Sequence, residues 1–202
     1  MLVIGLTGGS GSGKNEVAKI LFDRGISTID TDAVYHDLVS SDSECTRELA
    51  YAFGKEILNE DGSLARPRLA EIVFADDGDR PSRMKLLGDI THRYIKVKTE
   101  EFLLEEAKNG ARFAVIDAPV LFESGFSGLC DITLAVLASK RARLMRVVAR
   151  DGISEKKALM RISAQPTDDF YIERADFVIH NDGDIEALTK EVDRFLIYID
   201  QK

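Results

Sequence analysis

The chain has 202 residues, of which 35 are acidic and 27 are basic, so its formal net charge is −8. This balance argues against a nucleic-acid-binding protein, because affinity for a phosphate backbone comes from clustered lysine and arginine side chains. Hydrophobic residues make up 45% of the chain and charged residues 31%, as in ordinary folded domains and unlike a disordered tail. The length indicates one domain with an insertion, or two small lobes.

The cysteines and the apolar segments indicate the compartment. Cys45 and Cys130 are too far apart for the close pairs of a zinc site and too few for a disulfide framework, so we interpret both as reduced thiols. The apolar opening Leu2–Leu6 is much shorter than a signal-peptide core, and no later run reaches the about 18 apolar residues of a membrane span. We therefore expect a cytoplasmic protein with no membrane partner.

Five short apolar runs, separated by segments of helical pattern, predict the sheet. The runs are nearly continuous rather than alternating, which is typical of parallel strands buried on both faces. They are Leu2–Leu6, Ile26–Asp30, Phe113–Asp117, Ile132–Leu137 and Phe177–Ile179. This alternation predicts a doubly wound α/β fold with a five-stranded, mainly parallel sheet flanked by helices.

Helical patterning fills the long interval between the second and third runs and also ends the chain. We predict a helical insertion at about residues 33–110. In the final segment apolar residues recur at steps of three and four, which gives one buried stripe: Ile185, Leu188, Val192, Phe195 and Ile199. We expect this last helix to pack on the sheet.

A glycine-rich loop joins the first predicted strand to a helical pattern at Glu16–Phe22. It meets the spacing G-x-x-x-x-G-K with the sequence Gly8-Gly9-Ser10-Gly11-Ser12-Gly13-Lys14-Asn15. Such a loop turns successive N–H groups toward an anion, and its lysine reaches the outer phosphates of a nucleotide. The strand–loop–helix setting favours this interpretation over a glycine-rich turn without a ligand.

Two residues depart from the usual pattern of such loops. Asn15 stands where Ser or Thr normally offers a hydroxyl to Mg²⁺, and its amide oxygen can still reach a metal ion or the water around it. Glu16 suits the positive end of the helix dipole but would repel a phosphate if its side chain faced inward. Both changes bear more on turnover than on binding.

Acidic residues follow the second and third predicted strands, where an open α/β sheet binds its ligands. Asp30 and Asp32 would share one face if the strand continued. Asp32 can accept the proton of an attacking hydroxyl, or it can cap a helix that starts at Ala33. Asp117 follows four apolar residues in the way of an aspartate that holds Mg²⁺, or it is a turn residue before Pro119.

A basic helical segment lies near residues 139–164. Arginines recur at steps of three and four and lie within about 60° of one helix face, at Arg143, Arg146 and Arg150. Residues 140–161 hold eight basic and two acidic side chains. A solvated charged face is the usual explanation, but the arginine fork also matches phosphate oxygens. We predict that this segment is a lid that closes over a nucleotide.

Together these motifs closely resemble those of the dephospho-coenzyme A kinases over essentially the whole chain. The resemblance rests on Gly5-Leu6-Thr7-Gly8-Gly9, Ile29-Asp30-Thr31-Asp32, Phe53-Gly54, Asp117-Ala118-Pro119-Val120-Leu121-Phe122-Glu123, Arg146, Arg150-Asp151, Gln165, Ala175-Asp176 and Asn181. It implies one P-loop NTPase-type kinase domain across residues 1–202. The core would comprise about 1–32, 111–138 and 165–202, with a substrate-binding insertion at about 33–110 and the lid at about 139–164.

The resemblance also implies an activity and a site. Such an enzyme uses ATP and Mg²⁺ to phosphorylate the ribose 3′-hydroxyl of dephospho-CoA, the last step of coenzyme A synthesis, and we expect a monomer or weak oligomer. Asp32 would be the catalytic base, and Lys14 and Arg146 would stabilise charge on the phosphoryl group. The implied ATP site comprises Gly8, Gly9, Gly11, Ser12, Gly13, Lys14, Asn15, Glu16, Arg146, Arg150 and Asn181. The implied substrate contacts are Asp32, Arg66, His92, Pro119, Leu121 and Glu123, and the metal ligands are Asn15 and Asp117.

Two other functions stay open at this point. Another P-loop kinase, acting on a nucleoside or a sugar, would share the loop and the lid but not the pattern at Phe53–Phe74. A nucleotide-binding regulatory protein would keep binding while Asn15 and Glu16 impair the chemistry.

Overall fold

The computed structural model describes residues 1–201. They divide into two compact units. The first unit comprises Met1–Ile29 and the chain from Glu106 onward, and the second unit comprises Asp30–Glu105. Among the described residues, no helix is both long and apolar enough to cross a bilayer.

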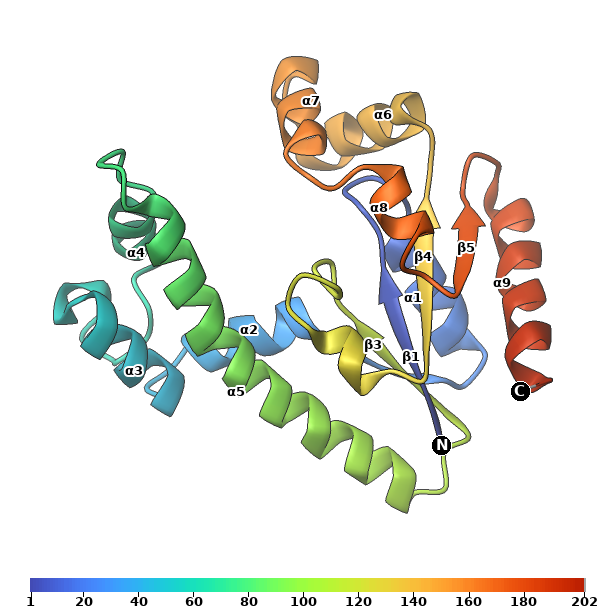
Figure 1. The fold of residues 1–202 in the computed structure, drawn as a ribbon, viewed down its shortest axis with the longest axis horizontal. Helices are drawn as coiled ribbons and strands as arrows, with labels where there is room; N and C mark the ends of the chain where they lie inside the picture. Colours follow the sequence, from blue (N-terminus) through green and yellow to red (C-terminus); the bar gives the residue numbers. More distant parts are fainter. Residues whose placement is uncertain (202) are drawn as a thin grey trace. The chain divides into compact units, whose positions relative to one another are not determined.

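A five-stranded sheet with the order β2-β3-β1-β4-β5 forms the centre of the first unit (Figure 1). The strands are β1 (Leu2–Thr7), β2 (Ser27–Asp30), β3 (Phe113–Asp117), β4 (Ile132–Leu137) and β5 (Phe177–His180). β1 pairs in parallel with both β3 and β4, and β4 pairs in parallel with β5. The predicted α/β fold is confirmed, and the strand ends differ from the predicted runs by no more than a residue.

Helices of the first unit cover this sheet and extend from it. They are α1 (Lys14–Asp23), α6 (Lys140–Asp151), α7 (Glu155–Ser163), α8 (Asp168–Ile172) and α9 (Ile185–Asp200), with a short 3₁₀ turn at Phe126–Leu129. α1 and α9 pack against each other beside the sheet. Four residues of the predicted stripe on α9 are buried, whereas Ile185, at the first position of the helix, is 55% exposed.

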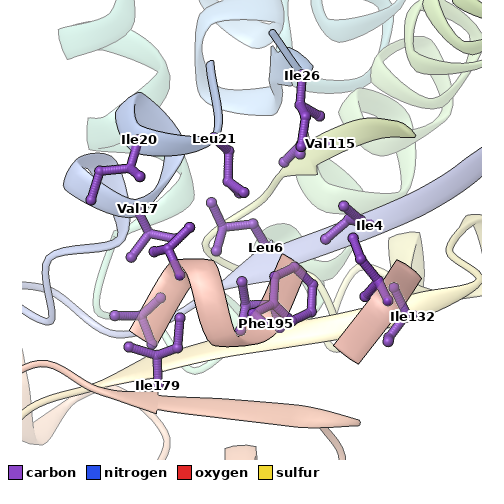
Figure 2. Close-up of a cluster of buried hydrophobic side chains, with 14 of the residues drawn as sticks. Ile4, Leu6, Val17, Ile20, Leu21, Ile26, Val115, Ile132, Ile179 and Phe195 are labelled. Atoms are coloured by element: carbon purple, nitrogen blue, oxygen red, sulfur yellow. The ribbon is translucent and has the colours of Figure 1, made fainter. Parts of the chain in front are cut away.

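The main hydrophobic core lies between the sheet and these two helices. Figure 2 shows Leu6 from β1, Val17 from α1 and Phe195 from α9 turned toward one another. All three side chains are completely buried. Because β1 and α1 are both fixed in this core, the glycine loop between them has firmly held ends.

The second unit is helical in its regular elements. It contains α2 (Thr31–Val39), α3 (Glu44–Phe53), a 3₁₀ turn at Lys55–Ile57, α4 (Arg66–Val73) and most of α5 (Arg80–Lys108). Its own core includes Leu49, Ile57 and Val73, all completely buried. Ser43 begins α3 with a capping box, since its hydroxyl accepts from the Thr46 N–H while the Thr46 hydroxyl accepts from the Ser43 N–H. The role of this unit in substrate binding stays a prediction.

Candidate functional site

The glycine loop is the first part of the site. β1 ends at Thr7, α1 begins at Lys14, and three loop glycines have a positive φ, including the helix cap Gly13 at 96°. A side chain at Gly13 would be strained by this φ and would also overlap the amide nitrogen of Asn181. Glycine is therefore required at this position by the backbone and by a close neighbour together.

The backbone donors of the loop fit an anion. The Ser12 N–H donates to the Gly9 carbonyl at 3.0 Å, but within residues 1–201 the amides of Gly11, Gly13, Lys14 and Asn15 have no hydrogen-bond acceptor. The Ser12 hydroxyl is buried and is likewise without a partner among the described residues. A phosphate at the N-terminus of α1 would accept from these amides and would give the buried Ser12 hydroxyl a partner.

Lys14 and Asp117 form a buried ion pair beside the loop. The Lys14 ammonium contacts Asp117 Oδ1, and the two side chains are only 11% and 6% exposed. Asp117 is the last residue of β3 and is in register with Leu6 of β1. The alternative that Asp117 is an ordinary turn residue is therefore wrong.

One of the two predicted metal ligands is exposed and the other is buried. Asn15 and Glu16 are both exposed in the first turn of α1, whereas Asp117 is buried. A carboxylate oxygen and an amide oxygen are ligands that Mg²⁺ accepts, and this ion usually keeps several waters. The described residues contain no cluster of three or more His, Cys, Asp or Glu for a metal ion. The residues thus fit an ion held mainly by phosphates and water.

Arg146 and Asn181 contact the back of the loop. Arg146 Nη1 donates to the carbonyls of Gly11 and Ser12 at 3.3 and 3.2 Å, and its Nη2 donates to the Asn181 carbonyl at 3.0 Å. Asn181 is 5% exposed, and its side-chain Nδ2 donates to the Ser12 carbonyl at 2.8 Å. Both residues were predicted in the ATP site, and both lie against the predicted phosphate loop.

Arg150 has a different partner. Its Nε and Nη2 donate to the carboxylate of Asp151 at 2.7 and 3.0 Å, and Arg161 of α7 also donates to that carboxylate. Asp151 therefore ties α6 to α7. The predicted role of Arg150 in ATP binding stays a prediction.

Arg143 and Gln165 also contact the loop, although neither was predicted from the sequence to lie in the ATP site. Arg143 Nε donates to the Ser10 carbonyl at 3.0 Å, and Gln165 Oε1 accepts from the Ser10 N–H at 2.8 Å. The sequence did carry signals for both, since Arg143 lies on the same helix face as Arg146 and Gln165 belongs to the family resemblance. Neither signal showed that their common target is Ser10.

The predicted substrate contacts that follow β3 differ in exposure. The Pro119 carbonyl accepts from the Thr7 hydroxyl at 3.1 Å. Leu121 is completely buried, and a Cβ added to Gly5 would lie 2.8 Å from its Cδ2. Its side chain is thus part of the core and does not reach a surface where a substrate could bind. Glu123 is exposed.

The structure corrects the local prediction around Asp32. β2 ends at Asp30 and α2 begins at Thr31, so Asp30 and Asp32 do not share the face of a strand. Asp30 is the helix cap, because its Oδ1 accepts from the N–H groups of Asp32 and Ala33 at 2.9 and 3.3 Å. The alternative that Asp32 caps the helix is therefore wrong, and its side chain is exposed in the first turn of α2.

Arg66 and His92 belong to the second unit, as does Asp32. The Arg66 guanidinium lies over the Tyr35 ring at 5.9 Å, which links α4 to α2. Arg66 also lines a cavity of about 390 Å³ together with Asn59, Leu64, Ala65, Pro67 and Arg68. His92, on α5, is half-buried, and this burial lowers its pKa below the usual 6.5.

Comparisons with known proteins agree with this arrangement. A family model described as dephospho-CoA kinase matches residues 2–187. A dephospho-CoA kinase of Corynebacterium efficiens is 38% identical over 199 residues, which are 98% of this chain and 98% of the relative. One of Moorella thermoacetica is 42% identical over 193 residues, or 95% of this chain and 89% of the relative. A crystal structure from Thermus thermophilus is similar to this chain with a TM-score of 0.76 and 32% sequence identity. The match covers 98% of this chain and 95% of the Thermus thermophilus chain. The chain belongs to the dephospho-CoA kinase family.

Proposed function

We propose that this protein transfers the γ-phosphoryl group of ATP to the ribose 3′-hydroxyl of dephospho-CoA, which gives coenzyme A and ADP. The loop at residues 8–15 carries this proposal, because it offers four amides without an acceptor among the described residues, next to a buried lysine. Membership of the family over nearly the full length supports the choice of acceptor.

The loop and its lysine would bind the polyphosphate of ATP. The amides at the start of α1 and the helix dipole favour negative charge there. Lys14 is held beside them by Asp117. When ATP binds, the ammonium of Lys14 would turn to the outer phosphates, where it stabilises the charge that develops as the bond to ADP breaks.

We assign the metal ion to Asn15 and Asp117, whose side-chain oxygens suit Mg²⁺. When bound, the ion would neutralise charge on the β- and γ-phosphates. Asn15 supplies an amide oxygen in place of a hydroxyl, and Glu16 is exposed in the first turn of α1.

Asp32 is the proposed base. Its carboxylate would accept the proton of the 3′-hydroxyl while that oxygen attacks the γ-phosphorus and the bond to the ADP oxygen breaks. Asp30 cannot serve as readily, because its Oδ1 already accepts two backbone N–H groups as the cap of α2. We propose that Arg66, His92, Pro119 and Glu123 contribute to holding dephospho-CoA, and that residues 139–164 form the lid.

A coupled assay of purified protein with ATP, Mg²⁺ and dephospho-CoA tests the function, and formation of coenzyme A is expected. Asp32→Asn should lower kcat by about 100-fold or more, the usual contribution of a general base, while ATP affinity stays unchanged. Asp37→Asn is the matched control, because Asp37 is an exposed aspartate on the same helix. Full turnover by Asp32→Asn would remove the proposed base but not the proposed function.

The same assay separates the other functions. A nucleoside or sugar kinase would consume ATP with those acceptors and not with dephospho-CoA. A regulatory protein would bind ATP in calorimetry without any turnover, and Asn15→Ser combined with Glu16→Thr would then be expected to restore it. Turnover of dephospho-CoA by the unmodified protein excludes both.

A further inference from the structure

Arg143 is a buried arginine that faces the phosphate loop. It belongs to the first turn of α6, yet its side chain is only 7% exposed. Nε donates to the Ser10 carbonyl and Nη2 donates to Gln165 Oε1, both at 3.0 Å. Nη1 lies 3.6 Å from a carboxylate oxygen of Asp168, which is half exposed. The guanidinium is therefore held on three sides.

Gln165 completes a closed set of hydrogen bonds around Ser10. Its Oε1 accepts from the Ser10 N–H at 2.8 Å, and its Nε2 donates to the Ser10 hydroxyl at 3.3 Å. Together with Arg143, it thus engages the amide, the carbonyl and the hydroxyl of Ser10. We call Arg143 and Gln165 the Ser10 clamp.

Two glycines of the loop lie very close to Arg143. A Cβ at Gly9 would overlap Arg143 Nη2 and would lie 3.0 Å from Cζ. A Cβ at Gly11 would lie 2.6 Å from the Arg143 carbonyl oxygen. Gly9 has no positive φ, so its own backbone does not require glycine. The loop therefore approaches Arg143 at two points where a side chain would not fit.

We propose that Arg143 is a positioning residue for the phosphates of the nucleotide. Four of the six residues 8–13 are glycines, and glycine loses more conformational freedom than other residues when it is ordered. Ordering this loop therefore has a large entropy cost. The Ser10 clamp orders the first half of the loop before ATP arrives, so binding does not have to supply that cost. Arg143 acts through Ser10 and does not itself contact the phosphates.

Nucleotide binding without the second substrate tests this inference, which rests on the proposed function only in assuming that the loop binds ATP. Arg143→Gln should weaken ATP binding in calorimetry about tenfold, as expected for loss of charge-assisted hydrogen bonds. It should raise the KM for ATP in proportion and leave the KM for dephospho-CoA unchanged. Arg141→Gln removes the same charge from an exposed position of the same helix and should stay within twofold of the parent.

Arg143→Lys separates positioning from charge. Lysine keeps the positive charge but lacks the fork that reaches Ser10 and Gln165 together, so its ATP affinity should resemble that of Arg143→Gln. Full affinity in Arg143→Lys would show that charge alone matters and would overturn the inference. Parental affinity in a folded Arg143→Gln would overturn it as well.

Gln165→Met tests the Ser10 clamp independently if Arg143→Gln does not fold. This variant keeps the length of the side chain and removes the acceptor of both the Ser10 N–H and Arg143 Nη2. ATP affinity should fall at least about threefold with no change in the KM for dephospho-CoA, and parental affinity would refute the clamp. If the parent binds ATP but forms no coenzyme A, only the proposed function fails. If the parent binds no ATP, both fail.

Discussion

The substitution Gly9→Ala isolates the fit between the phosphate loop and Arg143. The added methyl group would overlap Arg143 Nη2 and lie 3.2 Å from Gln165 Oε1. To make room, the buried guanidinium must give up at least one of its two hydrogen bonds, and a bond to a charged group contributes about 1.5–3 kcal/mol. For a chain of this length, 1 kcal/mol corresponds to about 2–4 °C in Tm, so we expect a decrease of about 3–12 °C.

The same substitution should be much less destabilising once the guanidinium is gone. In an Arg143→Ala background the overlap with the guanidinium is removed, the contact with Gln165 Oε1 at 3.2 Å remains, and Gly9 has no positive φ that alanine would resist. Replacing glycine in such a position can even stabilise a protein by about 0.4–1 kcal/mol through the unfolded chain. Thermal unfolding of the parent, both single variants and the double variant, without nucleotide, measures the coupling. An equal penalty for Gly9→Ala in both backgrounds would refute the reasoning.

Three further predictions concern the core, one histidine and the thiols. Phe195→Ala should lower the unfolding free energy by about 3–5 kcal/mol in denaturant titrations, because the ring is completely buried against Phe177. Burial lowers the pKa of His92, so the unfolded chain binds this proton more tightly; stability should decline as pH falls below about 6.5, and less so in His92→Gln. Burial raises the pKa of Cys45 to about 11 and that of Cys130 to about 12, so a thiol reagent at pH 8 should modify them far more slowly in native than in denatured protein.

The three central strands were predictable from sequence because they are buried on both faces. β1, β3 and β4 are short, nearly continuous apolar runs, as is typical of buried parallel strands, whereas the edge strands β2 and β5 are only partly buried. The order of the strands was not predictable in this way. β1 lies between β3 and β4, which are far away along the chain, and an apolar run does not encode its neighbour.

The end of β2 shows where local patterns fail. Asp30, Thr31 and Asp32 read equally well as the end of a strand or the start of a helix, since aspartate is favoured both at strand ends and at helix caps. Asp30 accepts the N–H groups of Asp32 and Ala33, so α2 begins at Thr31, two residues before the start at Ala33 that the sequence suggested. Asp32 therefore lies in the first turn of α2, where it is exposed.

The position of the basic helix was predicted from the sequence, but the partners of its arginines were not. Its periodicity correctly gave one face for Arg143 and Arg146, and the excess of positive charge suggested cations that face a nucleotide. Periodicity does not tell whether such a face meets a ligand or the protein itself. In the structure these guanidiniums donate to carbonyls of the loop, because a loop that turns its N–H groups toward an anion must turn its carbonyls the other way.

This use of α6 restricts how the segment can act as a lid. Arg143 and Arg146 make five hydrogen bonds to Ser10, Gln165, Gly11, Ser12 and Asn181. A swing of the whole segment 139–164 would break all of them and would leave loop carbonyls unpaired, at a cost of about 1–3 kcal/mol for each buried group. Closure that keeps the loop ordered must therefore hinge beyond Arg146. The pairs of Asp151 with Arg150 and Arg161 make the end of α6 and α7 the part that would move together.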